Sequence, residues 1–251
     1  MSRGADLARY YDLDLLTDPG DLSLYVSLAA DLRGPILELA VGSGRIAVPL
    51  AAAGHDVTGI DTDAAMLDRA RTKWAGITAR RGGTLTLIEH DLLTLDLPTR
   101  FDLVFVALNS LLLLDGRAAQ QRALATTRNH LAAGGRAVID VWLPTQDDLT
   151  LYDGREVLEW VRTDPDTGER VAKTSSALYD PATNTALLTS TFDGERRTTR
   201  ADKITFVGAR ELIEMVAIAG LEPEVIAGDY DLRPWSEASE RVVLVCSPKT
   251  A

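Results

Sequence analysis

The chain has little cysteine and histidine and no long apolar run. Of its 251 residues only Cys246 is a cysteine, so an internal disulfide is excluded, and "RVVLVCSP" fits a buried strand thiol. Its three histidines form no HxH pattern, and neither a cysteine cluster nor a carboxylate triad indicates a metal site. No segment approaches the roughly 20 apolar residues of a membrane span, and the N-terminus has no signal-peptide pattern. A cytoplasmic protein without a metal, away from the membrane, is predicted.

Positive charge is also scarce, because the formal net charge is −11. Nucleic-acid binding usually requires a basic surface, and no long Lys/Arg block is present. The densest basic cluster is Arg196, Arg197 and Arg200, which a solvated strand face explains. We therefore expect a small molecule, and no nucleic acid, as the partner.

What the chain does have is a glycine-rich turn between two apolar runs, in "ILELAVGSGRIAVPLAAAGHDVTGID" (36–61). Residues 35–40 read as a buried strand, 41–45 as the turn, and 55–61 as a second strand. The segment between them reads as a helix closed by Gly54. Such a β-α-β unit predicts two parallel strands joined by a right-handed crossover.

This turn is suited to a nucleoside-containing cofactor. Gly42 and Gly44 lack a Cβ, so backbone N–H groups at the helix N-terminus can approach a ligand closely. Asp61 ends the second strand, where a carboxylate can accept hydrogen bonds from both ribose hydroxyls. The segment "GSGRIA" also satisfies the dinucleotide pattern, with Ala47 in third place. Glu38 favours another ligand, because its carboxylate disfavours a pyrophosphate and suits the ammonium of a methionine-like group; alternatively, it caps a neighbouring element.

The segment "ELAVGSGR" resembles motif I of the class I S-adenosylmethionine-dependent methyltransferases of small molecules, and the resemblance covers about residues 34–145 and 205–249. It implies an α/β fold with a doubly wound, mostly parallel sheet of seven strands and an antiparallel last hairpin. The implied domains are N-terminal cap helices over 1–33 and a cofactor-binding domain over 34–150 and 205–251.

The resemblance also implies which residues hold S-adenosylmethionine and its product S-adenosylhomocysteine. Asp91 would bind the adenine amino group, and Met66 would pack near the adenine or serve as ordinary core. Tyr10 or Tyr11 would close over the sulfonium, unless both anchor their helix on the core. The implied cofactor-binding residues are Tyr10, Tyr11, Glu38, Ala40, Gly42, Gly44, Arg45, Asp61, Thr62, Met66, Asp91, Leu92 and Asn109.

Residues 151–204 interrupt the α/β alternation. Four strand-like segments are separated by the turn signals "DPDTG", "DPATN" and "DGE", which predict an antiparallel β meander inserted after the fifth strand. In related methyltransferases such an insertion covers the active site or forms a homodimer contact. A stabilising flap without a substrate role is the remaining alternative.

The acceptor site is expected at the carboxyl ends of the strands. Asn109 ends the fourth strand and could bind the substrate or the methionine carboxylate, or satisfy its own turn. Asn109 and Tyr11 are also the candidates for a catalytic role, because no histidine is placed as a general base, and this lack favours an amine acceptor. The candidate substrate-binding residues are Asn109, Trp142, Tyr230, Arg233 and Trp235.

The sequence therefore predicts transfer of a methyl group from S-adenosylmethionine to an N or O nucleophile of a small molecule, by in-line displacement. Two alternatives remain open. The first is a nicotinamide-dependent oxidoreductase that uses Gly42, Gly44, Ala47 and Asp61. The second is a non-catalytic protein that binds S-adenosylmethionine.

Overall fold

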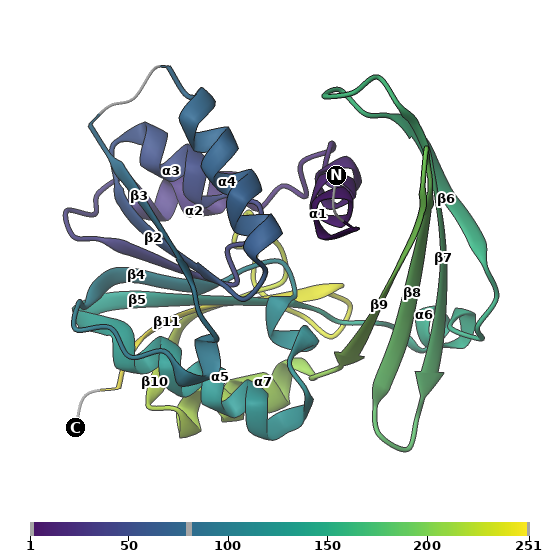
Figure 1. Ribbon diagram of the computed structural model, residues 1–251. Coiled ribbons are helices and arrows are strands. Elements are labelled where there is room, and N and C mark those ends of the chain that lie inside the picture. Colours follow the sequence, from purple (N-terminus) through teal and green to yellow (C-terminus); the bar gives the residue numbers. More distant parts are fainter. Residues whose placement is uncertain (1–2, 79–81, 250–251) are drawn as a thin grey trace.

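The computed structural model describes residues 3–78 and 82–249 and shows a seven-stranded sheet with helices on both faces (Figure 1). The strand order is β3-β2-β1-β4-β5-β11-β10. β1 to β5 are parallel neighbours, and β11 is antiparallel to both β5 and β10. This confirms the predicted doubly wound sheet. The strands are β1 Ile36–Leu39, β2 Asp56–Asp61, β3 Thr84–Glu89, β4 Phe101–Val106, β5 Leu131–Trp142, β10 Leu221–Ala227 and β11 Arg241–Pro248.

The helices form one layer on each face of this sheet (Figure 1). α2, α3 and α4 pack on the face that Ile36 and Phe105 bury, and α5 and α7 pack on the face that Leu37 and Val104 bury. In the part of the chain that the structure describes, no helix is long and apolar enough to cross a membrane. The helices are α2 Leu22–Ala29, α3 Ala47–Ala53, α4 Ala64–Gly76, α5 Gly116–His130 and α7 Ala209–Ile218, with the 3-10 turns η1 Leu92–Thr94 and η2 Ser110–Leu113.

The inserted segment forms a second, antiparallel sheet in the order β6-β7-β8-β9, as the turn signals predicted. A short helix that the sequence analysis did not anticipate, α6 (Gln146–Leu151), precedes it and begins with a capping box between Thr145 and Asp148. The strands of this sheet are β6 Val157–Thr163, β7 Arg170–Asp180, β8 Thr185–Asp193 and β9 Arg197–Thr205.

The N-terminal helix α1 (Arg3–Asp14) lies between the inserted sheet and the rest of the protein (Figure 1). On the side of the insertion, the buried guanidinium of Arg9 binds Asp164 and, at 2.8 Å, Glu169. Asp14 at the end of the helix accepts a hydrogen bond from Lys173 at 2.8 Å. These ion pairs attach α1 to the inserted sheet, so the two form one cover beside the carboxyl ends of the parallel strands.

Candidate cofactor and acceptor site

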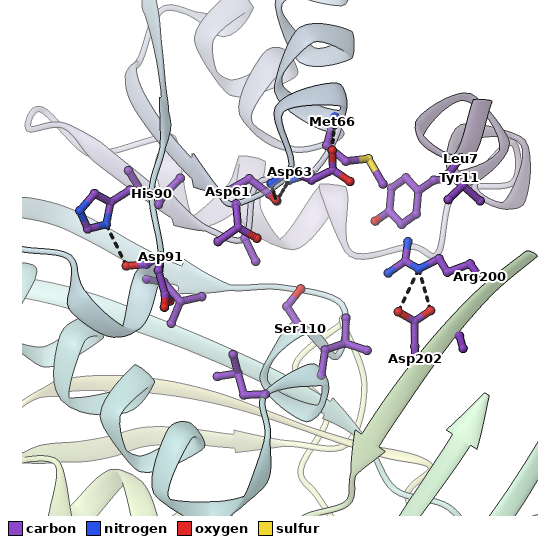
Figure 2. A pocket seen from close by; sticks show the side chains of 18 residues that line it. Leu7, Tyr11, Asp61, Asp63, Met66, His90, Asp91, Ser110, Arg200 and Asp202 are labelled. Atoms are coloured by element: carbon purple, nitrogen blue, oxygen red, sulfur yellow. Dashed lines mark hydrogen bonds and ion pairs between the residues drawn. The ribbon is translucent and has the colours of Figure 1, made fainter. Parts of the chain in front are cut away.

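A cavity of about 480 Å³ lies where the parallel strands end and α1 and β9 face them (Figure 2). One half is formed by the ends of β1, β2 and β3, and the other half by α1, η2 and β9. The lining residues are Leu7, Tyr11, Ala40, Gly42, Ile60, Asp61, Thr62, Asp63, Met66, His90, Asp91, Leu92, Ser110, Leu113, Leu114, Arg200, Ala201 and Asp202.

Asp61 at the end of β2 fixes the glycine loop. Its Oδ2 accepts a hydrogen bond from the Gly42 backbone N–H at 2.7 Å, and its Oδ1 accepts one from the Asp63 N–H at 2.9 Å. A carboxylate has about four lone-pair sites, so both oxygens can still accept hydrogen bonds from a diol. Asp61 is thus fixed in place by the backbone and remains able to bind two ribose hydroxyls.

The two glycines of the loop have different roles. Gly44 has φ +76°, and a Cβ there would lie 3.0 Å from the side chains of both Val48 and Ala70, so it permits close packing of α3 against α4. Gly42 has φ +53°, and a Cβ there would point towards Tyr11, 3.9 Å from Cε1 of the ring. The phenol ring therefore lies next to the open side of Gly42, and both residues line the cavity.

Glu38 on β1 is a buried carboxylate with an unsatisfied oxygen. Its exposed fraction is 4%, and Oε2 has no hydrogen-bond partner among residues 3–78 and 82–249. Burial raises the pKa of Glu38 well above its ordinary value, although Arg45 and the Ala47 backbone N–H favour the charged form. A buried acceptor without a partner is costly, so this position suits a cationic ligand group.

The end of β3 supplies the far end of the cavity. Asp91 begins η1, because its Oδ1 accepts a hydrogen bond from the Leu93 backbone N–H at 2.8 Å. The Nδ1 atom of His90 lies 2.9 Å from the Asp91 carbonyl oxygen. Asp91 and Leu92 both line the cavity, where a carboxylate and a backbone N–H can bind the polar edge of a base.

α1 is attached to the glycine loop next to Tyr11. Ser43 Oγ donates a hydrogen bond to Asp12 at 2.6 Å, and Lys73 Nζ donates one to the same carboxylate at 2.7 Å. Burial raises the pKa of Tyr11 to about 12, so its hydroxyl stays protonated at neutral pH. Asp12 therefore holds a neutral phenol over the cavity.

Comparisons with known proteins indicate the kind of enzyme to which this chain is similar. Residues 36–135 match the family model described as a methyltransferase domain. The cypemycin N-terminal methyltransferase of a Streptomyces species is 27% identical over 239 residues, which are 94% of this chain and 93% of that protein. The solved structure of the CcbJ methyltransferase from Streptomyces caelestis is 26% identical with a TM-score of 0.78, over 92% of this chain and 97% of that chain. These likenesses show an S-adenosylmethionine-dependent methyltransferase, whose methyltransferase domain includes residues 36–135.

A third likeness concerns the fold alone. An S-adenosylmethionine-dependent methyltransferase from Clostridium acetobutylicum is 17% identical, with a TM-score of 0.79 over 98% of each chain. S-adenosylmethionine is the cofactor of this methyltransferase, and two carboxylates suit it. Asp61 lines the cavity and has free lone pairs. Glu38 is not among the lining residues, but it has an unsatisfied buried oxygen on β1, two residues before the lining residue Ala40. The assignment replaces both alternatives that the sequence left open, the nicotinamide-dependent oxidoreductase and the non-catalytic binding protein.

The structure brings most of the predicted cofactor residues of the methyltransferase together. Tyr10 is an exception: its ring stacks on Phe192 of the inserted sheet, with centroids 5.0 Å apart, so it anchors α1 instead of facing the cavity. Arg45 turns to Asp21, with two hydrogen bonds of 2.5 and 2.6 Å, and is not among the lining residues. Those that line the cavity are Tyr11, Ala40, Gly42, Asp61, Thr62, Met66, Asp91 and Leu92. Glu38, Gly44 and Asn109 are not among the lining residues either.

The five predicted substrate-binding residues are not among the described residues that line the cavity. Asn109 (φ +65°) accepts a hydrogen bond from the Trp142 backbone N–H at 2.6 Å. Its side-chain amide therefore pairs with the last backbone N–H of β5. The Trp142 ring packs on the rings of Tyr152 and Phe206. Tyr230 donates to the buried Asp140 at 2.9 Å.

The last two of the five belong to the loop before β11. Arg233 pairs with Asp229 and Asp231 of its own loop, at 3.1 and 3.0 Å. The Trp235 indole N–H is buried, without a hydrogen-bond partner in the described ranges 3–78 and 82–249. Both residues lie near the sheet edge that the sequence indicated, but their side chains pack locally.

In the half of the cavity formed by α1, η2 and β9, sequence reasoning found Tyr11 and missed the other described lining residues. Ser110 and the leucines of η2 directly follow Asn109, which the sequence analysis had singled out. The loop after β4 was therefore recognised as part of the site, but the wrong residue of it was chosen. No sequence signal indicated that Arg200 and Asp202 line the cavity, because their position depends on how the inserted sheet folds back over α1. The sequence alone favours a solvated strand face for Arg200, whereas the structure places it in the lining of the cavity.

Proposed function

We propose that this methyltransferase transfers the methyl group of S-adenosylmethionine to an amine nitrogen of a small molecule. Residues 34–150 and 205–251 would hold the cofactor, and α1 with the insertion 151–204 would cover the acceptor. The main support for this proposal is the negative charge of the cavity, because its described lining has four aspartates and a single arginine. The aspartates are Asp61, Asp63, Asp91 and Asp202.

A negative cavity attracts cations, and an amine acceptor arrives mainly as its ammonium ion. After the proton leaves to solvent, the free lone pair needs no general base at the moment of attack. The cypemycin enzyme is named as an N-terminal methyltransferase, and the nucleophile of a peptide N-terminus is an amine. Both considerations support nitrogen over oxygen as the methylated atom.

The residues of the chain would align the reactants. S-adenosylmethionine, when bound, supplies a methyl group activated by a sulfonium. Asp61 would bind the ribose, Asp91 the adenine and Glu38 the ammonium, which fixes the direction of the methyl group. Ser110 Oγ donates to the Ala107 carbonyl at 2.7 Å, so its lone pairs can accept an amine N–H and orient the nitrogen. The new N–C bond forms as the C–S bond breaks.

Methyl transfer from labelled S-adenosylmethionine to a panel of primary and secondary amines, each beside its matched alcohol, tests the proposal. We expect a labelled N-methyl product and one equivalent of S-adenosylhomocysteine from at least one amine, and none from the matched alcohols. Transfer to alcohols alone would contradict the amine assignment.

A further inference from the structure

The inserted sheet contributes one charged pair to the cavity, Arg200 and Asp202 on β9. The two side chains lie on the same face of the strand, because they are two residues apart. Arg200 Nε donates to Asp202 Oδ1 at 2.9 Å and lies 2.7 Å from Oδ2. Asp202 therefore holds the guanidinium by its Nε edge.

The other edge of the Arg200 guanidinium is free. In the part of the chain that the structure describes, the terminal nitrogens Nη1 and Nη2 make no hydrogen bond. Figure 2 shows the guanidinium between the Tyr11 ring and Asp202, with the terminal nitrogens on the side away from the carboxylate. Two parallel N–H groups of this kind match the two oxygens of a carboxylate.

We propose that Arg200 binds a carboxylate of the acceptor and that Asp202 is its positioning residue. The acceptor class is then an amino acid or short peptide that carries both the amine and a carboxylate. This inference rests on the proposed function and deepens it. A phosphate dianion fits less well, because the remaining charges of the lining, at Asp61, Asp63 and Asp91, would repel it.

The inference competes with a structural role, in which the pair only joins two positions of β9. Binding measurements separate the two without turnover. The methyltransferase, saturated with S-adenosylhomocysteine, is titrated calorimetrically with α-amino acids and dipeptides and with their matched C-terminal carboxamides. We expect the best carboxylate to bind about tenfold or more tightly than its carboxamide, as for a charge-assisted hydrogen-bonded pair.

Arg200→Gln should abolish that difference, and the matched variant Arg197→Gln should keep it. Arg197 lies on the opposite face of β9, where its nearest carboxylate is Asp193 at 3.5 Å. Asp202→Asn should reduce the difference, since the Nε edge of the guanidinium is then held less firmly. Unchanged melting temperatures would show that the variants fold.

Equal affinity for acid and carboxamide, a preference that survives Arg200→Gln, or no measurable binding of any carboxylate would each overturn the inference. Failure of the proposed function is distinguishable, because it appears in the labelled methyl-transfer assay. Carboxylate binding through Arg200 without methylation of any amine would contradict the function and leave the binding site standing.

Discussion

The two halves of the cavity are built in different ways. We call the ends of β1, β2 and β3 the proposed cofactor half, and α1, η2 and β9 the proposed acceptor half. In the cofactor half, carboxylates bind backbone N–H groups 2 to 19 positions away in the chain: Asp61 binds those of Gly42 and Asp63, and Asp91 binds that of Leu93. In the acceptor half, long side chains hold α1 against the inserted sheet. The Arg9–Glu169 pair, for example, joins residues 160 positions apart.

This difference separates what is constant from what can change. Backbone hydrogen bonds fix the cofactor half to the strand ends, so its geometry follows from the fold. The acceptor half depends on side-chain pairs between α1 and a separate sheet, and single substitutions there can alter it without disturbing the main core. One fold can thus keep its cofactor while its acceptor changes.

The largest effect is expected for Arg9→Ala, which removes the buried cation that joins α1 to the inserted sheet. Asp164, only 1% exposed, would lose its cationic partner Arg9. Removing one partner of a buried ion pair costs about 3–5 kcal/mol in the free energy of unfolding. We expect that loss in urea unfolding and faster hydrogen exchange in α1, with S-adenosylmethionine affinity changed much less.

The matched control is Arg155→Ala, because Arg155 forms an exposed ion pair with Asp153. Such pairs contribute roughly 0–1 kcal/mol. If α1 exchanged at the same rate in both variants, the view that ion pairs hold the acceptor half in place would be wrong.

In the cofactor half, Glu38→Gln should weaken S-adenosylmethionine binding about tenfold or more, because the ligand ammonium loses a charged partner. Burial raises the pKa of Glu38 in the free protein, and a bound cation favours its carboxylate, so binding releases a proton. The affinity of the wild type should therefore rise with pH through that raised pKa, and the variant should lack this rise. Calorimetric titrations over a pH series measure it, and parallel pH slopes would speak against the role of Glu38.

The same shift has a consequence for stability. At pH values between the pKa of Glu38 in the unfolded chain and its raised pKa in the folded protein, the folded protein keeps a proton on Glu38 that the unfolded chain has released. The free energy of unfolding contributed by this group therefore falls as pH rises through that window. Without cofactor, Glu38→Gln should be more stable than the wild type above the window, which urea unfolding at several pH values tests.

The smallest expected effect lies where the two halves meet, at Tyr11. Removing the ring with Tyr11→Leu removes a cation–π partner of about 0.5–2 kcal/mol, so kcat/KM should fall roughly twofold to thirtyfold. Tyr10→Phe is the matched control, since that ring stacks on Phe192 away from the cavity. Equal losses in Tyr11→Leu and Tyr10→Phe would show that the ring of Tyr11 acts only through the packing of α1.

The sequence predicted the cofactor half because its signals are local. Gly42, Asp61 and Asp91 follow apolar runs, and parallel strands bring the ends of such runs to one edge. The inserted meander was predicted for the same reason, from turns that can be read along the chain. The seven-stranded sheet with its antiparallel last hairpin was implied by the resemblance to the methyltransferases.

The acceptor half was not predictable, because it depends on contacts between distant segments. Tyr10 and Tyr11 are adjacent on a helix that is buried on two sides, and only the position of the inserted sheet shows which ring faces the cavity. Asn109 and Trp142 were placed at the correct edge of the sheet, but they bind each other across two strand ends. Arg200 could be placed only once the insertion was seen to fold over α1.

The most direct test is calorimetric titration of Asp61→Ala with S-adenosylmethionine, beside the wild type and Asp56→Ala. Asp56 lies at the opposite end of β2, where its carboxylate binds Thr84 at 2.7 Å. We predict about tenfold or greater loss of affinity for Asp61→Ala, since charge-assisted hydrogen bonds contribute roughly 1.5–3 kcal/mol, and wild-type affinity for Asp56→Ala. Wild-type affinity in a folded Asp61→Ala protein would contradict the placement of the cofactor in this cavity.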